Sequence, residues 1–129
     1  TRNGLYKSIN GGTTWTKVLG AGVGAVDNRI SDIEIGADNN IYAGIGLFTT
    51  DGVYKSPTGN GGTWTKLNTG LNGFATTGFS RVELACAPSN ALVVYAITQS
   101  TATNGVYQIL QSTDGGTTWT VKTNPVDAD

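Results

Sequence analysis

The chain has 129 residues and a formal net charge of −1, from 8 basic and 9 acidic residues. A nearly neutral chain of this length is enough for one modest domain and lacks the basic surface that binds nucleic acid or an anionic membrane. It contains one cysteine and no histidine, which excludes an internal disulfide, histidine metal ligands and serine–histidine catalysis. No apolar run approaches the roughly 20 residues of a membrane-spanning helix. We expect no metal site, no cofactor and no membrane insertion.

The predicted elements are all β-strands, because glycine and threonine are abundant and helix-forming residues never cluster at a helical period. The first pair of strands lies within residues 1–18, on either side of a polar turn. Ile33 and Ile35 alternate with Asp32 and Glu34, as in a strand with one buried face. After the first pair, the predicted strands lie at about 30–36, 40–46, 53–56, 63–67, 81–87, 92–98, 106–112 and 117–122.

Two kinds of turn connect these strands. Asn3-Gly4, Asp51-Gly52 and Asn104-Gly105 predict type I′ hairpin turns, in which both central residues need a positive φ. The second kind is a repeated segment, "SINGGTTW" at 8–15, "SPTGNGGTW" at 56–64 and "STDGGTTW" at 112–119. In this segment an Asp or Asn accepts hydrogen bonds from the turn, glycines supply positive φ, and the tryptophan covers the turn.

The spacing of the copies, with the tryptophans 49 and 55 residues apart, is typical of propeller blades. The pattern Ser-x-Asp-x-Gly-x-x-Trp resembles that of the Asp-box, or BNR, repeat family, whose members include sialidases, xyloglucan-cleaving glycosidases and sortilin-type receptors. In the second copy Asn60 stands in for the aspartate from a shifted position. The residues that carry the resemblance are Ser8, Asn10, Gly12 and Trp15; Ser56, Asn60, Gly62 and Trp64; and Ser112, Asp114, Gly116 and Trp119.

The resemblance implies an all-β chain built from propeller blades of four antiparallel strands. Residues 1–18 form half a blade, 29–67 a full blade and 81–122 another, so that 1–129 is a partial propeller of about two and a half blades. Because a propeller needs about four to eight blades to close, we expect further blades of the same chain, or another copy of it, as partners. The first residue already lies inside a repeat, which indicates a segment of something longer.

Carboxylates are the candidates for glycoside cleavage. Asp51 is the one catalytic candidate, since xyloglucanase-like relatives place an aspartate near the same hairpin, but the equivalent residues Asn3 and Asn104 favour a plain turn role. Asp32 and Glu83 occupy equivalent positions in innermost strands, near Arg29 and Arg81. There they could bind a ligand or, in the structural role that we favour, form ion pairs between blades. The three arginines, Arg2 included, do not match the sialidase arginine cluster.

Aromatic residues divide into recurrent and irregular ones. The tyrosines recur at equivalent strand positions, as packing between blades requires. The irregular Phe48, Phe74 and Phe79 are the candidates for binding a glycan or protein, although such loop phenylalanines also plug interfaces between blades.

The sequence therefore predicts a non-catalytic scaffold or recognition module that binds protein or glycan. The style of the repeats is similar to that of large secreted bacterial surface proteins, which implies a secreted or cell-surface location. Two alternatives stay open: a segment of a glycoside hydrolase of the xyloglucanase or sialidase type, and a fragment of a sortilin-like receptor.

Overall fold

The computed structural model describes residues 3–25, 27–47 and 49–126, and these residues form ten β-strands and no helix. The all-β expectation is therefore confirmed. No helix long and apolar enough to cross a membrane is found in the described part of the chain.

The strands form three antiparallel sheets, in each of which strands that follow one another along the chain are hydrogen-bonded neighbours. The first sheet has two strands, β1 (Leu5–Lys7) and β2 (Thr16–Leu19). The second has the order β3 (Ile30–Ile35), β4 (Ile41–Gly46), β5 (Thr50–Ser56) and β6 (Thr65–Lys66). The third has the order β7 (Phe79–Cys86), β8 (Val94–Ser100), β9 (Val106–Ser112) and β10 (Thr120–Lys122).

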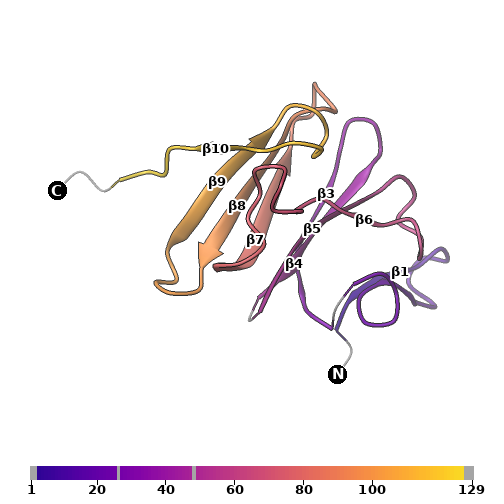
Figure 1. The fold of residues 1–129 in the computed structure, drawn as a ribbon. Helices are drawn as coiled ribbons and strands as arrows, with labels where there is room; N and C mark the ends of the chain where they lie inside the picture. Colours follow the sequence, from indigo (N-terminus) through magenta and orange to yellow (C-terminus); the bar gives the residue numbers. More distant parts are fainter. Residues whose placement is uncertain (1–2, 26, 48, 127–129) are drawn as a thin grey trace.

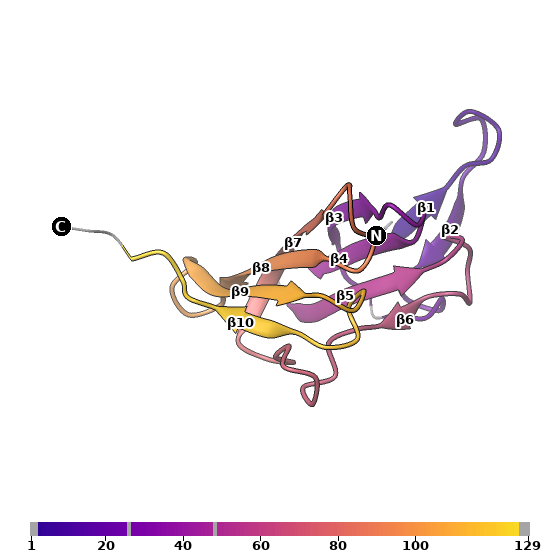
Figure 2. The ribbon, with the colours of Figure 1, turned by 90° about the horizontal axis from the view of Figure 1, so that it is seen from above.

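The second sheet lies between the other two. Figures 1 and 2 show the first sheet (indigo) and the third sheet (orange to yellow) at opposite ends of the molecule. The second and third sheets meet at their first strands, where Ser31 Oγ donates to the Val82 carbonyl at 2.6 Å. One residue further along, the Leu84 backbone N–H donates to the Asp32 carboxylate at 2.7 Å. Asp32 thus contacts the third sheet, through a backbone N–H and not through an arginine as in the ion pair that the sequence suggested.

Two apolar cores fill the spaces between the sheets. The larger core joins the second and third sheets through Tyr42, Val53, Phe74, Phe79, Val82, Leu84, Val94, Ala96, Leu110 and Trp119. The smaller core joins the first and second sheets through Leu19, Ala43, Ile45 and Tyr54. Because hydrophobic stabilisation scales with the apolar area buried, the first sheet is held less firmly than the third.

The Asp51-Gly52 hairpin prediction is wrong. Both residues are buried within β5, and Gly52 pairs with Ile45 of β4. A Cβ added to Gly52 would lie 1.7 Å from Asn68 Oδ1, so the glycine permits the close approach of the buried Asn68. That side chain joins β5 to the segment after β6, since Asn68 Nδ2 donates to the Asp51 carbonyl at 2.8 Å.

The Asn104-Gly105 prediction is correct only in part. Asn104 has a φ of 61°, but Gly105 is not among the described residues with positive φ, and both belong to the longer connection between β8 and β9. The connection closes through the backbone N–H of Asn104, which donates to the Ser100 carbonyl at 3.0 Å. A two-residue type I′ turn is therefore replaced by a longer loop.

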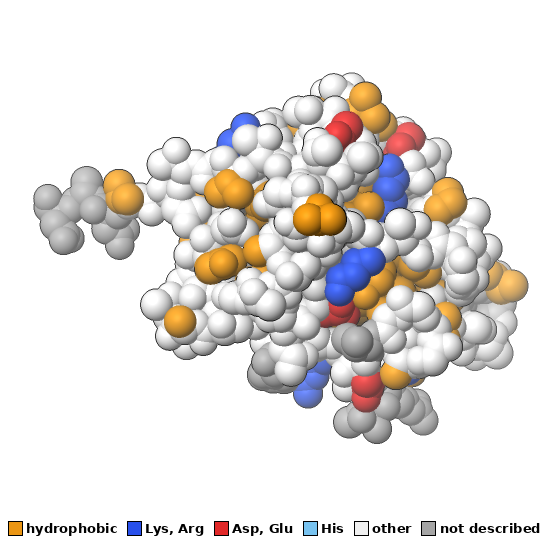
Figure 3. Space-filling view, in the orientation of Figure 1, with side chains coloured by type: hydrophobic (Ala, Val, Ile, Leu, Met, Phe, Trp, Pro, Cys, Tyr) orange, Lys and Arg blue, Asp and Glu red, His pale blue; other side chains and the backbone are white. Residues whose placement is uncertain are grey.

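Few charged side chains lie on the face shown in Figure 3, where small hydrophobic patches are separated by backbone and uncharged side chains. This view agrees with the 13% of charged residues in the sequence and shows no broad basic surface on that face.

Candidate functional site

The first and third of the three repeated segments fold into the same turn. We call residues 8–15, 56–64 and 112–119 the first, second and third box turns. In the third, Ser112 Oγ accepts from the Gly116 backbone N–H at 2.7 Å, and Asp114 Oδ1 accepts from the Thr118 backbone N–H at 2.8 Å. The glycine and carboxylate therefore act as the sequence predicted.

The first box turn repeats these contacts with an amide in place of the carboxylate. Ser8 Oγ accepts from the Gly12 N–H at 2.8 Å, and Asn10 Oδ1 accepts from the Thr14 N–H at 2.9 Å. Asn10 Nδ2 also donates to the Thr14 hydroxyl at 2.9 Å. An asparagine therefore replaces the aspartate without changing the turn.

The carboxylate of the third box turn is strongly favoured in its ionised form. The Thr118 hydroxyl and backbone N–H both donate to Asp114, and these hydrogen bonds lower the pKa of Asp114 from 3.8 to about 2. Asp114 is thus a structural acceptor at neutral pH, held by donors of its own turn.

The second box turn differs in its side-chain contacts. The backbone of Asn60 occupies the position that Asp114 has in the third box turn. The Asn60 carbonyl accepts from the Thr63 hydroxyl at 2.8 Å, as the Asp114 carbonyl does from the Thr117 hydroxyl. Its side chain, however, does not take the role of the aspartate, since Asn60 Oδ1 accepts from Lys7 Nζ at 2.9 Å. The prediction for Asn60 is correct for the backbone and wrong for the side chain.

In the second turn two extra residues, Thr58 and Gly59, precede the asparagine. Ser56 Oγ accepts from the Gly59 N–H at 2.8 Å and from the Thr58 N–H at 3.2 Å. It also shares a hydrogen bond of 2.6 Å with the Thr63 hydroxyl. The hydroxyls of Ser56, Thr58 and Thr63 therefore hold the longer turn together, and the Asn60 side chain binds the neighbouring sheet through Lys7. Gly62 keeps its positive φ of 81°.

The three tryptophans have different surroundings. Trp119 is 5% exposed and meets Phe74 edge-to-face, with ring centroids 5.2 Å apart. Trp64 is half-buried against the smaller core. Trp15 is 61% exposed, and its indole N–H donates to the Gly12 carbonyl at 2.9 Å. The first box turn thus presents an open tryptophan.

A lysine clamp joins the first sheet to the second box turn and the second sheet to the third box turn. Lys7 of β1 donates to the Thr58 carbonyl at 2.7 Å in the second box turn. Lys55 of β5, at the equivalent position beside the box serine, donates to the Gly115 carbonyl at 3.1 Å in the third. The Tyr42 hydroxyl donates to the same Gly115 carbonyl at 3.3 Å. The box turns are therefore docking points between sheets, which sequence reasoning missed.

Asp51 is a buried structural carboxylate. Its side chain is 1% exposed, and Oδ1 accepts from Lys66 Nζ at 2.8 Å and from the Tyr54 hydroxyl at 3.0 Å. Burial and the adjacent carboxylate raise the pKa of Tyr54, which keeps this hydroxyl a donor. A substrate has no access to a carboxylate in this position, so the geometry opposes the catalytic hypothesis for Asp51.

Arg81, Glu83 and Asp32 have different kinds of partner. Arg81 and Glu83 form an exposed ion pair on β7, whereas Asp32 binds the backbone of the third sheet. Burial, with nearby carboxylates, raises the pKa of the Cys86 thiol to about 11, so it stays a thiol at neutral pH. Among the described residues, no group of three or more histidine, cysteine, aspartate or glutamate side chains could hold a metal ion.

The predicted binding phenylalanines are not on the surface. Phe74 and Phe79 are both fully buried in the larger core, with ring centroids 5.7 Å apart. They plug the space between the second and third sheets, so the binding hypothesis is wrong for both. Phe48 lies outside the described residues.

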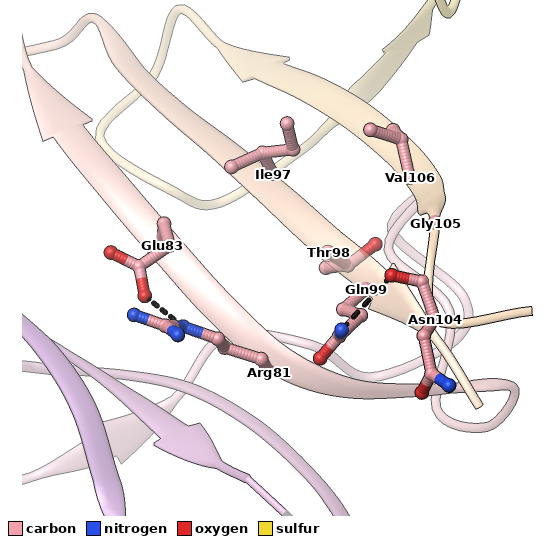
Figure 4. A pocket seen from close by; sticks show the side chains of 8 residues that line it. All are labelled: Arg81, Glu83, Ile97, Thr98, Gln99, Asn104, Gly105 and Val106. Carbon is pink, nitrogen blue, oxygen red and sulfur yellow. Dashed lines mark hydrogen bonds and ion pairs between the residues drawn. The ribbon is translucent and has the colours of Figure 1, made fainter.

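Two apolar surfaces in the described part of the chain are open to solvent. The outer face of the third sheet, which points away from the second sheet, carries Tyr95, Ile97 and Ile109, and Tyr95 is 42% exposed. A hollow of about 320 Å³ lies at one end of this face. In Figure 4, Ile97 and Val106 lie across this hollow from the Arg81–Glu83 pair.

The second surface is a groove of about 310 Å³ along the free edge of β1. Ile33 and Ile35 of β3 line this groove and stay 45% and 64% exposed there. Trp15 of the first box turn also lines it. Apolar exposure on this scale is typical of a surface that binds another protein segment.

No known protein family matches the chain, and no curated protein is significantly similar to it.

Proposed function

We propose that the chain is a non-catalytic scaffold or recognition segment of a β-propeller of the Asp-box type, in which the second and third sheets are blades and the first sheet is half a blade. The four-stranded meanders and the recurring box turns support this proposal. The resemblance of the box segments also supports a location at the cell surface or outside the cell.

The observation that carries the proposal is the lysine clamp. Lys7 and Lys55 occupy equivalent strand positions and both donate to the box turn of the following sheet. The polar groups of the second and third box turns are therefore used to hold sheets side by side. Such a repeated contact, with each sheet touching its neighbours, is the stabilising principle of a repeat scaffold.

The glycosidase alternative depends on Asp51. Its carboxylate is buried, forms an ion pair with Lys66 and accepts a hydrogen bond from Tyr54. A catalytic carboxylate has to reach the scissile glycosidic bond. We therefore assign Asp51 to stability and not to catalysis.

A panel of polysaccharides, with released reducing sugar as the readout, tests this assignment. The chain, Asp51→Asn and Lys66→Met are compared after circular dichroism has shown that all three are folded. Lys66→Met is the matched control, because it breaks the same ion pair and keeps the carboxylate. We expect no sugar release from any of them. Release by the unchanged chain that is lost in Asp51→Asn and kept in Lys66→Met would overturn the proposal.

A further inference from the structure

The lysine clamp has a counterpart on the open face of the third sheet. In the second sheet Tyr42 and Lys55 are register partners on adjacent strands, and together they bind the Gly115 carbonyl. Tyr95 and Gln111 are the register partners at the equivalent positions of β8 and β9. They lie on the outer face, where Gln111 Nε2 donates to the Tyr95 hydroxyl at 2.6 Å.

Among the described residues no neighbouring sheet covers Tyr95, in contrast to Tyr42. Tyr42 is fully buried, whereas Tyr95 is 42% exposed and lies near the exposed Ile97. The outer face thus repeats the donors and apolar residues with which the second sheet binds a box turn.

The complementary feature is the first box turn, at the other end of the molecule, and the third box turn is the reference for it. A Cβ placed on Gly115 of the third box turn would meet Lys55 Nζ at 3.0 Å and the Tyr42 hydroxyl at 3.6 Å. The equivalent Gly11 of the first box turn has nothing within 4 Å. The first box turn is therefore folded, exposed and unoccupied at the site where the third is clamped.

We propose that the outer face of the third sheet binds the first box turn of a second copy of this chain. Tyr95 and Gln111 donate to the Gly11 carbonyl of the second copy, as Tyr42 and Lys55 do to that of Gly115 within one copy. The contact joins different surfaces of the two copies, so it is head-to-tail, and repeated contacts build a ring or an open row.

The shape of the outer face favours this partner over a complete four-stranded sheet. Gly44 allows β7 to lie against β4, because a Cβ on Gly44 would be 2.6 Å from the Val82 carbonyl. The third sheet has Ile97 at the position of Gly44, pairing with Ile109 as Gly44 does with Val53. If a four-stranded sheet lay on this face, and its first strand came as close to β8 as β7 comes to β4, that strand would collide with Ile97. Among the described residues the first sheet consists of β1, which leads into the first box turn, and β2, which follows it, so the described part of this sheet brings no such first strand to Ile97.

One variant blocks each surface. Gly11→Asn closes the first box turn: asparagine tolerates the φ of 68° at Gly11, but its side chain would fill the clamp position. Gly22→Asn is its matched control, because Gly22 has a φ of 78° and also has nothing within 4 Å. Ile97→Asp closes the outer face, and Leu71→Asp is its control, at a loop residue that is 98% exposed.

Sedimentation velocity at micromolar to millimolar concentrations is the measurement. We expect the unchanged chain and both controls to associate, and each blocking variant to associate at least about tenfold more weakly, as for the loss of a central contact. A mixture of Gly11→Asn and Ile97→Asp should form a complex of one copy of each, because each partner keeps the surface that the other has lost.

Three results would overturn the proposal. The unchanged chain could stay monomeric throughout, or the blocking variants could associate as well as their controls. The mixture could also fail to form the mixed complex, which would mean that the copies meet through one shared surface. If Ile97→Asp does not fold, the isosteric Gln111→Glu replaces it, since its carboxylate would repel the Gly11 carbonyl.

Discussion

At the scale of single residues, the box turns show how one carboxylate and one amide perform the same task. Asp114 and Asn10 both accept from a backbone N–H four residues later, at 2.8 and 2.9 Å. The two side chains differ in a second hydrogen bond. Asp114 accepts from the Thr118 hydroxyl, whereas Asn10 donates to the Thr14 hydroxyl. The amide turn is independent of pH, and the carboxylate turn is not.

This difference predicts an acid-sensitive contribution to stability. Because hydrogen bonds from Thr118 lower the pKa of Asp114 to about 2 from 3.8, the contribution is complete above pH 3.8 and is lost as the pH falls toward 2. Asp114→Asn should lower the free energy of unfolding at pH 7 by less than about 1 kcal/mol, since the site is open to solvent. Urea titrations at pH 7, 4 and 2 measure both proteins.

The stability difference between the two proteins should shrink between pH 4 and pH 2. Asn10→Ala is the comparison variant, since its cost should be the same at each of these pH values. A difference between Asp114→Asn and the unchanged chain that stays constant down to pH 2 would contradict the assigned hydrogen bonds.

At the scale of elements, the lysine clamp stabilises the contact between sheets. Lys55→Met keeps the apolar stem over the Tyr42 ring but removes the donor to the Gly115 carbonyl. We expect a loss of about 1 kcal/mol in the free energy of unfolding, the usual net value of one hydrogen bond. Lys122→Met, on the exposed strand β10, is the control and should change little. Both free energies of unfolding are measured by urea denaturation. Equal effects of the two substitutions would contradict a stabilising role of the clamp.

How much the sequence predicts depends on whether the contacts of a residue are local. The hydrogen bonds of Ser112 and Asp114 lie within one turn, so their roles follow from residue types and spacing. Asp51 was misplaced because Asn3 and Asn104 precede glycines at equivalent positions, and only the distant Lys66 and Asn68 bring Asp51 into β5. The burial of a loop residue such as Phe74 likewise depends on contacts remote in sequence.

The lysine clamp likewise could not be predicted from local sequence. Lys55 and Gly115 are 60 residues apart, and nothing near either residue indicates that they meet. The recurrence of "YKS" at residues 6–8 and 54–56 was the signal that could have led to it. Its replacement by "LQS" at 110–112 was the corresponding signal for the open face.

At the scale of the whole molecule, the sheets differ in how much core they share. The second and third sheets share the larger core, whereas the first sheet is joined by a smaller one and borders the open groove. Unfolding of the first sheet should therefore need less free energy than global unfolding. Native-state hydrogen exchange should show lower protection for the amides of β1 and β2 than for those of β7, β8 and β9. Equal protection in all three sheets would mean that the small core couples them fully.

The short length of β1 has a consequence for solubility. Exposed strand edges commonly lead to aggregation, because they offer a row of unpaired backbone donors and acceptors to other chains. In the described part of the chain β1 spans only three residues, pairs with β2 alone, and has a register shift between Leu5 and Tyr6. So brief and irregular an edge is a poor template for amyloid-like growth. The geometry of β1 therefore limits association of copies through this strand edge.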